Sequence, residues 1–537
     1  MSPDSSRRGA RSLPHLLAQV YDRHAGEAAL LYEDHWLTFE ESAHLAAGID
    51  QILREAGATL GDRVILCMDN SPIARLIDQT LLGCGYVRVA LSPRLHPREI
   101  AEIAADAEAA VVCCSPQREH EVDAALRARE IASVVVAFES TAEQRARLRD
   151  AAPSPTPTTR VSPSGTAMLM YSSGTTGKAK GVVVSQASWI AQTNRALAHL
   201  PPITNDDVVV LAAPMAHFAG SIGLDCLVEG ARTVMLSPFD PATVMDAVST
   251  HRATVLPLVP TLLARLLDEV GGQPGAASSL RSVPYGGSPS SVETLLAAAR
   301  FLPGVLTQFY GLAEALAPLA VLSAADHDRA AATRSGTPDA DAVIARLRTA
   351  GRWVPEIEHR EGSQGSIRVR GNVVMDGYWK NPQLSESVLQ DGWLTTGDVG
   401  RTDADGYLHI LGRSSDLIIS GGYNVYPREV ERVIEDVDGV AEVAVLGLPD
   451  ARWGEGVHAF VVLAPASPFA RRRSGTAELE EAIRAACLAE IASYKKPVGI
   501  HVIDEMPRNP FGKVDRAALR AHASPADHQP PAETEQH

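Results

Sequence analysis

Residues 171–181 read YSSGTTGKAKG and come directly after an apolar stretch. A strand followed by hydroxyl side chains, glycines and lysines offers backbone N–H groups, O–H donors and positive charge to a polyphosphate. The segment differs from a Walker A loop, because Gly174 and Gly177 are separated by two residues and Ala179 follows Lys178 where that loop requires Ser or Thr. It predicts a phosphate-binding loop of another kind, attached to a strand of an α/β sheet.

On both sides of this loop, helical patterns alternate with short apolar strands. Phe39–Glu55 has helical periodicity, and Arg63–Met68 reads as the strand that follows it. Such alternation is typical of βαβ units around a parallel sheet. After about residue 365, short strands linked by Gly and Asp turns predict a small β-barrel or ribbon subdomain. Pro427 is expected to begin a helix in a compact α+β region. Further strands are expected at Val208–Ala212, Thr254–Leu258 and Leu280–Tyr285.

The pattern therefore predicts an α/β chain with a large N-terminal domain of βαβ subdomains plus a small β-barrel, followed by a small α+β C-terminal domain. We place the N-terminal domain at residues 13–412 and the C-terminal domain at residues 413–521. Residues 1–12 and the Pro/Ala/Glu/His-rich residues 522–537 are expected to be disordered.

Composition narrows the class of protein. The chain has 537 residues and a net charge of −16, which is too long for one ordinary domain and too acidic for a nucleic-acid binder. No apolar run reaches the ~18 residues of a membrane span. The six cysteines lack zinc-type spacing and are expected to be reduced thiols of a cytoplasmic protein. Only six of the 49 Lys and Arg residues are lysines, namely Lys178, Lys180, Lys380, Lys495, Lys496 and Lys513.

Seven further motifs follow the loop in order along the chain. They are PMAHFAG at Pro214, GGSP at Gly286, YGLAE at Tyr310, TGD at Thr396, GRSSD at Gly412, GGYNVYP at Gly421 and NPFGK at Asn509. With these motifs the chain resembles the ANL superfamily of adenylate-forming enzymes, and most closely the acyl-CoA synthetases, or AMP-forming carboxylate:CoA ligases. The resemblance implies ATP, Mg²⁺ and CoA: a carboxylic acid attacks the α-phosphate of ATP to give acyl-AMP and pyrophosphate, and the thiol of CoA then takes the acyl group.

The resemblance also implies how the nucleotide is held. Lys178 and Lys513 supply positive charge, the latter at the α-phosphate and the substrate carboxylate, and Glu314 holds Mg²⁺ together with Thr176. Asp398 is expected at the ribose, because a carboxylate can accept both hydroxyls at once. The other implied ATP/AMP-binding residues are Ser173, Gly174, Thr175 and Gly177 at the phosphates, Tyr310 and Gly311 at the adenine, Gly286, Gly287 and Ser288 along its edge, and Arg413 at the ribose.

The acid and the acceptor thiol are expected at other motifs of the same family. Ser415 occupies the hinge about which a mobile C-terminal domain rotates between the half-reactions. No Asp stands near His217, which disfavours an α-amino acid as the substrate. The implied acyl-site residues are His217, Phe218, Ser221, Val259 and Tyr285. The implied lining of the CoA pantetheine tunnel consists of Gly421, Gly422 and Tyr423.

The sequence departs from the family pattern at several positions and leaves other functions open. Ala179 replaces Pro, Ala313 replaces Thr, Ser415 replaces Asp or Lys, and residues 336–362 fit the family poorly. One alternative is a biosynthetic adenylating enzyme that passes the acyl group to a carrier-protein thiol or an amine, or that activates an unusual acid. Another is a non-catalytic scaffold, which the retention of the expected catalytic residues disfavours.

Overall fold

The computed structural model describes residues 12–150, 161–173, 179–270, 277–334, 336–420, 423–450, 452–464, 467, 469, 475–509 and 513–523. The chain divides into two compact units. The larger contains Met1–Ser363, Ile367–Thr396 and Arg401–His409, and the smaller contains Gln364–Ser366, Gly397–Gly400 and Ile410–His537. No helix within the described ranges is long and apolar enough to cross a bilayer.

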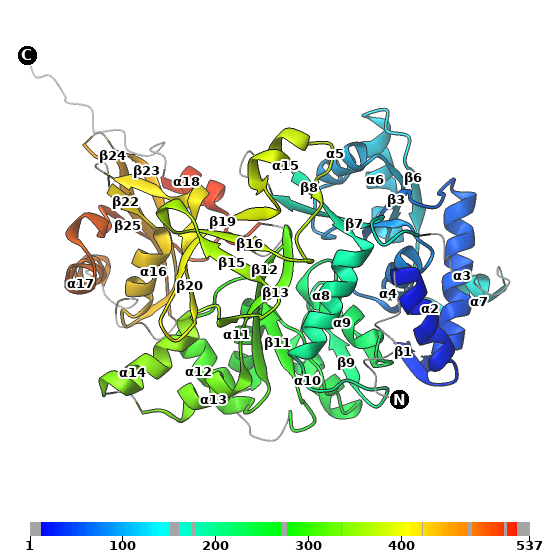
Figure 1. Cartoon of the computed structure of the whole chain (residues 1–537), viewed down its shortest axis with the longest axis horizontal. Coiled ribbons are helices and arrows are strands. Elements are labelled where there is room, and N and C mark those ends of the chain that lie inside the picture. Colours follow the sequence, from blue (N-terminus) through cyan, green and yellow to red (C-terminus); the bar gives the residue numbers. More distant parts are fainter. Residues whose placement is uncertain are drawn as a thin grey trace, which may run out of the picture. The chain divides into compact units, whose positions relative to one another are not determined.

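The expected phosphate-loop segment belongs to a seven-stranded sheet of the larger unit (Figure 1). In spatial order its strands are β17 (Gly377–Tyr378), β8 (Ala179–Ser185), β7 (Thr166–Ser173), β4 (Val87–Ala90), β3 (Arg63–Cys67), β5 (Ala109–Cys114) and β6 (Val134–Ala137). From β7 to β6 the neighbouring strands are parallel, whereas β8 runs antiparallel to both β7 and β17. Residues 64–67 of β3 are all buried, as the apolar run predicts for a strand covered on both faces.

Helices α4 (Pro72–Gly83), α5 (Pro97–Ala107) and α6 (Pro116–Arg127) contact strands of this sheet. Helices α2 (Leu13–Arg23) and α7 (Ala142–Asp150) contact α3 (Phe39–Glu55). Helix α3 has the predicted bounds and begins in a capping box, in which Thr38 Oγ1 accepts from the N–H of Glu41 and the Glu41 carboxylate accepts from the N–H of Thr38. It packs against α4 and α7 (Figure 1) and buries Leu45 and Ile49 in a core shared with Val64.

Two four-stranded sheets form the next part of the larger unit. One has the order β2 (His35–Thr38), β1 (Ala28–Tyr32), β10 (Arg232–Met235) and β9 (Val208–Leu211), and the other has the order β11 (Val283–Gly286), β12 (Leu306–Leu312), β13 (Ala315–Leu322) and β14 (Arg352–Trp353). The segment Thr254–Leu258, predicted to be a strand, forms only isolated bridges. Val255 pairs with Val209 and with Ser282, so it lies between the two sheets. The helices of this part are α8 (Gln186–Ala198), α9 (Phe218–Leu227), α10 (Pro241–Thr250), α11 (Pro260–Val270), α12 (Val292–Phe301), α13 (Ala324–Ala332) and α14 (Pro338–Ala345).

A buried carboxyl group fastens α9 to α8. Asp225 Oδ1 accepts a hydrogen bond from Thr193 Oγ1 at 2.7 Å, and Oδ2 accepts one from Gln192 Nε2 at 2.9 Å. Burial raises the pKa of Asp225 to about 7, although both hydrogen bonds and the charge of Arg75 act in the opposite direction. This anchor holds the helix whose first turn carries the expected acyl-site residues Phe218 and Ser221.

The region that follows, where the sequence predicts a small β-barrel or ribbon, contains a five-stranded sheet. The order is β15 (Glu358–Glu361), β16 (Ser366–Arg370), β19 (Trp393–Thr402) and β18 (Leu389–Gln390), with β20 (Leu408–Arg413) also paired to β19. Helix α15 (Pro382–Val388) precedes β18. The alternation of short strands and turns identified these strands. Isolated bridges from Arg352 to Tyr407 and from Ala315 to Val374 join this region to the sheet of β11–β14.

The smaller unit has the predicted α+β character. Its sheet has the order β22 (Tyr423–Val425), β21 (Ile418–Ser420), β24 (Gly454–Leu463) and β23 (Val440–Asp450), and β25 (Gly499–Val502) pairs with β24. Its helices are α16 (Pro427–Glu435), α17 (Gly475–Glu490) and α18 (Arg516–Ala523), so the last helix ends at residue 523 and not at the predicted boundary of 521. One core cluster contains Val430 and Val445, and a second contains Phe460 and Met506.

Candidate active site

The predicted phosphate loop joins strands β7 and β8 of the larger unit. Ser173 pairs with Ala179, and Tyr171 pairs with Gly181. The Tyr171 hydroxyl donates to Asp106 Oδ2 at 2.5 Å, which fixes the base of the hairpin. Gly174, Thr175, Thr176, Gly177, Lys178 and the side chain of Ser173 lie outside the described residues.

Glu314, the expected metal ligand, stands between β12 and β13 and is held at both its backbone and its side chain. Its carbonyl oxygen accepts from the N–H of Met375 at 2.9 Å. Its carboxylate oxygen Oε1 accepts from the hydroxyl of Tyr378 at 2.9 Å. The ammonium group of Lys180 lies 5.6 Å from the centre of the Tyr378 ring. The structure thus brings a carboxylate, a phenol and a cation together beside the hairpin that carries the phosphate loop.

Strands β11 and β12 bring the expected adenine residues together. The strands are parallel, with Gly286 opposite Phe309, so Gly286 and Tyr310 lie near the same carboxyl-terminal edge, where ligands commonly bind in α/β sheets. A Cβ atom on Gly286 would lie 2.5 Å from the carbonyl oxygen of Phe309, so only glycine allows this approach. Gly287 and Ser288 follow in an exposed turn, and Gly311 follows Tyr310 on β12.

The expected acyl-site residues His217, Phe218 and Ser221 lie at the start of α9. The rings of Phe218 and Phe309 meet edge to face with centroids 6.2 Å apart, which places α9 against strand β12. Val259 is partly buried, and its carbonyl oxygen accepts from the N–H of Leu263 at 3.0 Å in the first turn of α11. The structure therefore places Phe218 close to the expected adenine edge.

Tyr285 is an exception among the expected acyl-site residues. Its side chain is fully buried in the core, and its hydroxyl lies 2.7 Å from His327 Nε2 and 3.1 Å from Gln308 Oε1. Successive residues of a strand face opposite sides of a sheet, and Gly286 faces Phe218. Tyr285 consequently points away from Phe218 and is a core residue, which corrects its assignment to the acyl site.

The expected ribose residues Asp398 and Arg413 meet within the smaller unit. Asp398 is 5% exposed, and its Oδ1 lies 3.2 Å from Nε of Arg413. Ser414 Oγ donates to the carbonyl oxygen of Gly397 at 3.2 Å. The expected hinge residue, Ser415, donates from Oγ to Asp416 Oδ1 at 3.2 Å. These contacts give two polar ribose candidates a defined relative orientation.

The smaller unit also carries Lys513 and Tyr423. Lys513 is exposed and has two hydrogen bonds with Asn509: its N–H donates to Asn509 Oδ1 at 3.1 Å, and its carbonyl oxygen accepts from the N–H of Asn509 at 2.8 Å. Tyr423 is 58% exposed, and its ring stacks on that of Tyr494 with centroids 4.6 Å apart. Gly421 and Gly422 lie outside the described residues.

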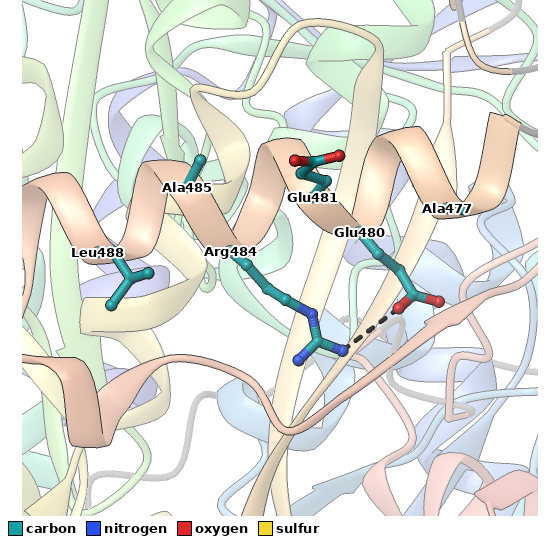
Figure 2. A pocket seen from close by; sticks show the side chains of 6 residues that line it. All are labelled: Ala477, Glu480, Glu481, Arg484, Ala485 and Leu488. Carbon is teal, nitrogen blue, oxygen red and sulfur yellow. Dashed lines mark hydrogen bonds and ion pairs between the residues drawn. The ribbon is translucent and has the colours of Figure 1, made fainter.

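A shallow hollow on the surface of α17 is a separate feature (Figure 2). Its charged lining includes an ion pair between Arg484 Nη2 and Glu480 Oε2 at 3.3 Å, one helical turn apart. Such a surface pair stabilises a helix by only a few tenths of a kcal/mol. None of the expected site residues lines it; the lining is Ala477, Glu480, Glu481, Arg484, Ala485 and Leu488.

Comparison with known proteins decides the family. The pattern of the AMP-binding enzyme family matches residues 17–379, more than half of the chain. This chain belongs to the AMP-binding enzyme family. The pattern of the AMP-binding enzyme C-terminal domain matches residues 429–513, which include Lys513. The resemblance drawn from the ordered motifs is confirmed, as is a mixed α/β fold with a large N-terminal and a smaller C-terminal domain.

Relatives of this AMP-binding enzyme align over almost its whole length. It is 32% identical to the medium/long-chain-fatty-acid–CoA ligase FadD8 of Mycobacterium tuberculosis, over 94% of this chain and 89% of that one. It is 34% identical to feruloyl-CoA synthase of Amycolatopsis sp, over 96% of this chain and 97% of that one. Among solved structures, the amide bond synthetase McbA from Marinactinospora thermotolerans superimposes with a TM-score of 0.81 at 29% identity, covering 95% and 100% of the two chains.

Tyr378 and Asn70 of this AMP-binding enzyme contact expected site residues or the segment beside them, and neither was singled out from the sequence. Tyr378 reaches Glu314 from 64 residues away. Asn70 binds the segment before His217, because its Nδ2 donates to the carbonyl oxygen of Ala213 at 2.8 Å and its Oδ1 accepts from the N–H of Met215 at 3.0 Å. Both contacts are between residues distant in sequence, so local periodicity carries no signal for them.

Proposed function

We propose that this chain activates a carboxylic acid with ATP, giving acyl-AMP and pyrophosphate, and then transfers the acyl group to the thiol of coenzyme A, giving acyl-CoA and AMP. It is an AMP-forming acid–thiol ligase. The observation that carries the proposal is similarity to named CoA ligases at 32% and 34% identity over 94% and 96% of the chain. The substrates are accordingly a carboxylic acid, ATP and CoA.

In this proposal the first step joins two anions, so the site must hold them in line and offset their charge. Lys178 and the loop from Ser173 bind the β- and γ-phosphates, and Lys513 meets the α-phosphate and the acid. Asp398 accepts from the ribose hydroxyls, and its contact with Arg413 supports this role by restricting how its carboxylate turns. Tyr310 packs on the adenine, with Gly286, Gly287, Ser288 and Gly311 around it.

We assign Mg²⁺ to Glu314 and Thr176. Carboxylate oxygens suit this hard cation, which usually takes one or two carboxylates together with substrate phosphates. Glu314 fits, because it presents a carboxylate beside the hairpin that carries the phosphate loop. Among the described residues no group of three or more His, Cys, Asp or Glu side chains could hold a metal. When bound, Mg²⁺ offsets the negative charge of the phosphates.

The second step requires a site for the acyl group and a tunnel for CoA. His217, Phe218, Ser221 and Val259 line the acyl site, and the exposed Tyr423 lines the CoA tunnel with Gly421 and Gly422. The two domains are residues 13–412 and residues 413–523, the second extended from the expected boundary of 521 to the end of α18, with rotation about Ser415. The six free cysteines support a reducing, cytoplasmic location.

The test measures pyrophosphate release and acyl-CoA formation by the purified full chain with a panel of aliphatic, aryl and amino-aryl acids. Acyl-CoA and AMP are expected only when ATP, Mg²⁺, CoA and an accepted acid are present together, whereas pyrophosphate release requires the acid, ATP and Mg²⁺. If the chain released pyrophosphate in the presence of the acid but formed no acyl-CoA when CoA was added, the CoA ligase function would be contradicted.

A second candidate function is favoured by one observation, the structural likeness to an amide bond synthetase at a TM-score of 0.81. In that case the acyl group passes from acyl-AMP to an amine, or to the thiol of a carrier protein. Reactions with the accepted acid are run with CoA, with a holo carrier protein or with amines. Mass spectrometry of the products identifies the acceptor.

A further inference from the structure

Strand β17 connects the turn that carries Glu314 with the hairpin that carries the expected phosphate loop. At one end, the N–H of Met375 donates to the carbonyl oxygen of Glu314 at 2.9 Å. At the other end, the N–H of Trp379 donates to the carbonyl oxygen of Gly181 at 2.7 Å. Tyr378 lies between these two contacts and pairs with Val182 of β8.

Hydrogen bonds from neighbouring residues hold the backbone at Tyr378. Its N–H donates to Ser385 Oγ at 2.8 Å, and that hydroxyl donates to the carbonyl oxygen of Asn381 at 2.8 Å. The next residue is held as well, because Trp379 Nε1 donates to the carbonyl oxygen of Asp106 at 3.0 Å. The phenol therefore projects toward Glu314 from a strand with little freedom to move.

The contact between the two side chains favours one orientation of the carboxylate. A glutamate has three rotatable side-chain bonds, and restricting them costs up to ~2 kcal/mol of conformational entropy. Because Oε1 accepts from the Tyr378 hydroxyl, the carboxylate is oriented before any ligand binds. Within the described ranges, Oε2 has no hydrogen bond and is available as a ligand atom.

We propose that Tyr378 is a positioning residue that orients Glu314 for the metal–nucleotide complex and also carries the cation of Lys180 on its ring. This inference rests on the proposed function, in which Glu314 holds Mg²⁺. The ammonium group of Lys180 is 5.6 Å from the ring centre, on the strand that continues from the phosphate loop. One side chain thus couples the carboxylate to a lysine of the hairpin.

The test compares the wild-type chain with Tyr378→Phe, which keeps the ring and removes the hydroxyl. ATP binding is measured by isothermal titration calorimetry in EDTA and over a series of MgCl₂ concentrations. In EDTA the two proteins are expected to bind ATP equally. The MgCl₂ concentration that gives half of the increase in affinity should rise about tenfold in the variant, the factor that corresponds to ~1.4 kcal/mol. Pyrophosphate release should show the same shift in its Mg²⁺ requirement.

Two further variants separate positioning from a merely structural role. Tyr378→Leu also removes the ring, so it should weaken ATP binding in EDTA as well. Tyr86→Phe removes a matched bond, from the Tyr86 hydroxyl to Asp50 Oδ1 at 2.7 Å, and should leave the Mg²⁺ requirement unchanged. An unaltered Mg²⁺ requirement in Tyr378→Phe, with or without a lower melting temperature, would overturn the inference alone. A wild-type chain that binds no ATP in the presence of Mg²⁺ would overturn the proposed function together with it.

Discussion

Replacing Asp225 by Asn should make the protein more stable at alkaline pH. Asp225 is fully buried between α8 and α9, and its pKa is raised from 3.8 to about 7 by burial. A carboxyl group with a raised pKa in the folded state binds its proton more tightly there than in the unfolded chain. Its contribution therefore favours folding at low pH and is lost as the pH rises from about 4 to about 7.

The size of this effect follows from the pKa. A displacement from 3.8 to about 7 corresponds to about 4 kcal/mol when Asp225 is fully ionised, at 1.36 kcal/mol for each pH unit. Between pH 5.5 and pH 8 the same relation gives a loss of about 2 kcal/mol. An asparagine keeps the shape, still accepts from Thr193, and can donate to Gln192 if that amide turns over. Gln192 Oε1 is buried and has no hydrogen-bond partner among the described residues, so it can accept this bond.

The assay is urea unfolding of the wild-type chain and Asp225→Asn at both pH values. The difference in unfolding free energy between the two proteins should shift by about 2 kcal/mol in favour of the variant at pH 8. Asp225→Ala is the matched control, because it leaves the Thr193 hydroxyl and the Gln192 amide without their acceptor. It should be destabilised by about 1–3 kcal/mol for each unpaired group relative to Asp225→Asn. A pH dependence that is identical in the wild-type chain and Asp225→Asn would refute the reasoning.

Three other predictions concern Lys513, Gly220 and the reactivity of the cysteines. Lys513→Ala should lower acid-dependent pyrophosphate release at least about a hundredfold while leaving thioester formation from pre-made acyl-AMP mostly intact, and a fully active variant would exclude the proposed role. Gly220→Ala places a Cβ atom 1.8 Å from the carbonyl oxygen of Met215 and should cost about 3 kcal/mol or more in urea unfolding, whereas Gly26→Ala, with no atom within 4 Å, should be nearly neutral. Burial raises the pKa of Cys67 and Cys84 to about 12 and that of Cys114 and Cys487 to about 11. Ellman's reagent at pH 8 should therefore label the native chain slowly and reach all six thiols only after denaturation. One rapidly labelled thiol in the native chain would contradict this.

Local sequence predicted local structure well. Phe39–Glu55 is a helix with the predicted bounds, and Pro427 begins one as expected. In both cases the signal lies within a few residues, in a capping box or in a proline of the first turn. The Thr254–Leu258 segment has an apolar pattern as well, but it forms only bridges, because whether an extended segment becomes a strand depends on its neighbours in the sheet.

The candidate site was predictable as a set of residue types and only partly as a geometry. Asp398 and Arg413 belong to motifs that the sequence identified, and they do lie together. Tyr285 was misplaced although a signal existed: strand alternation and the neighbouring Gly286 imply that the two residues face opposite sides. No local pattern indicated Tyr378, because its contact with Glu314 forms only when strand β17 pairs with β8, far away in the sequence.

The two-residue strand β17 also occupies the edge of the seven-stranded sheet. Unpaired strand edges are templates for pairing with another molecule, and a short, twisted edge is one of the ways in which proteins prevent it. If β17 detached, the outer backbone groups of β8 at Val182 and Val183 would lose their partners and could pair between molecules. A substitution that breaks this strand, unlike the loss of one hydroxyl, would therefore appear first as aggregation during purification, and a low yield of such a variant would report on colloidal behaviour and not on catalysis.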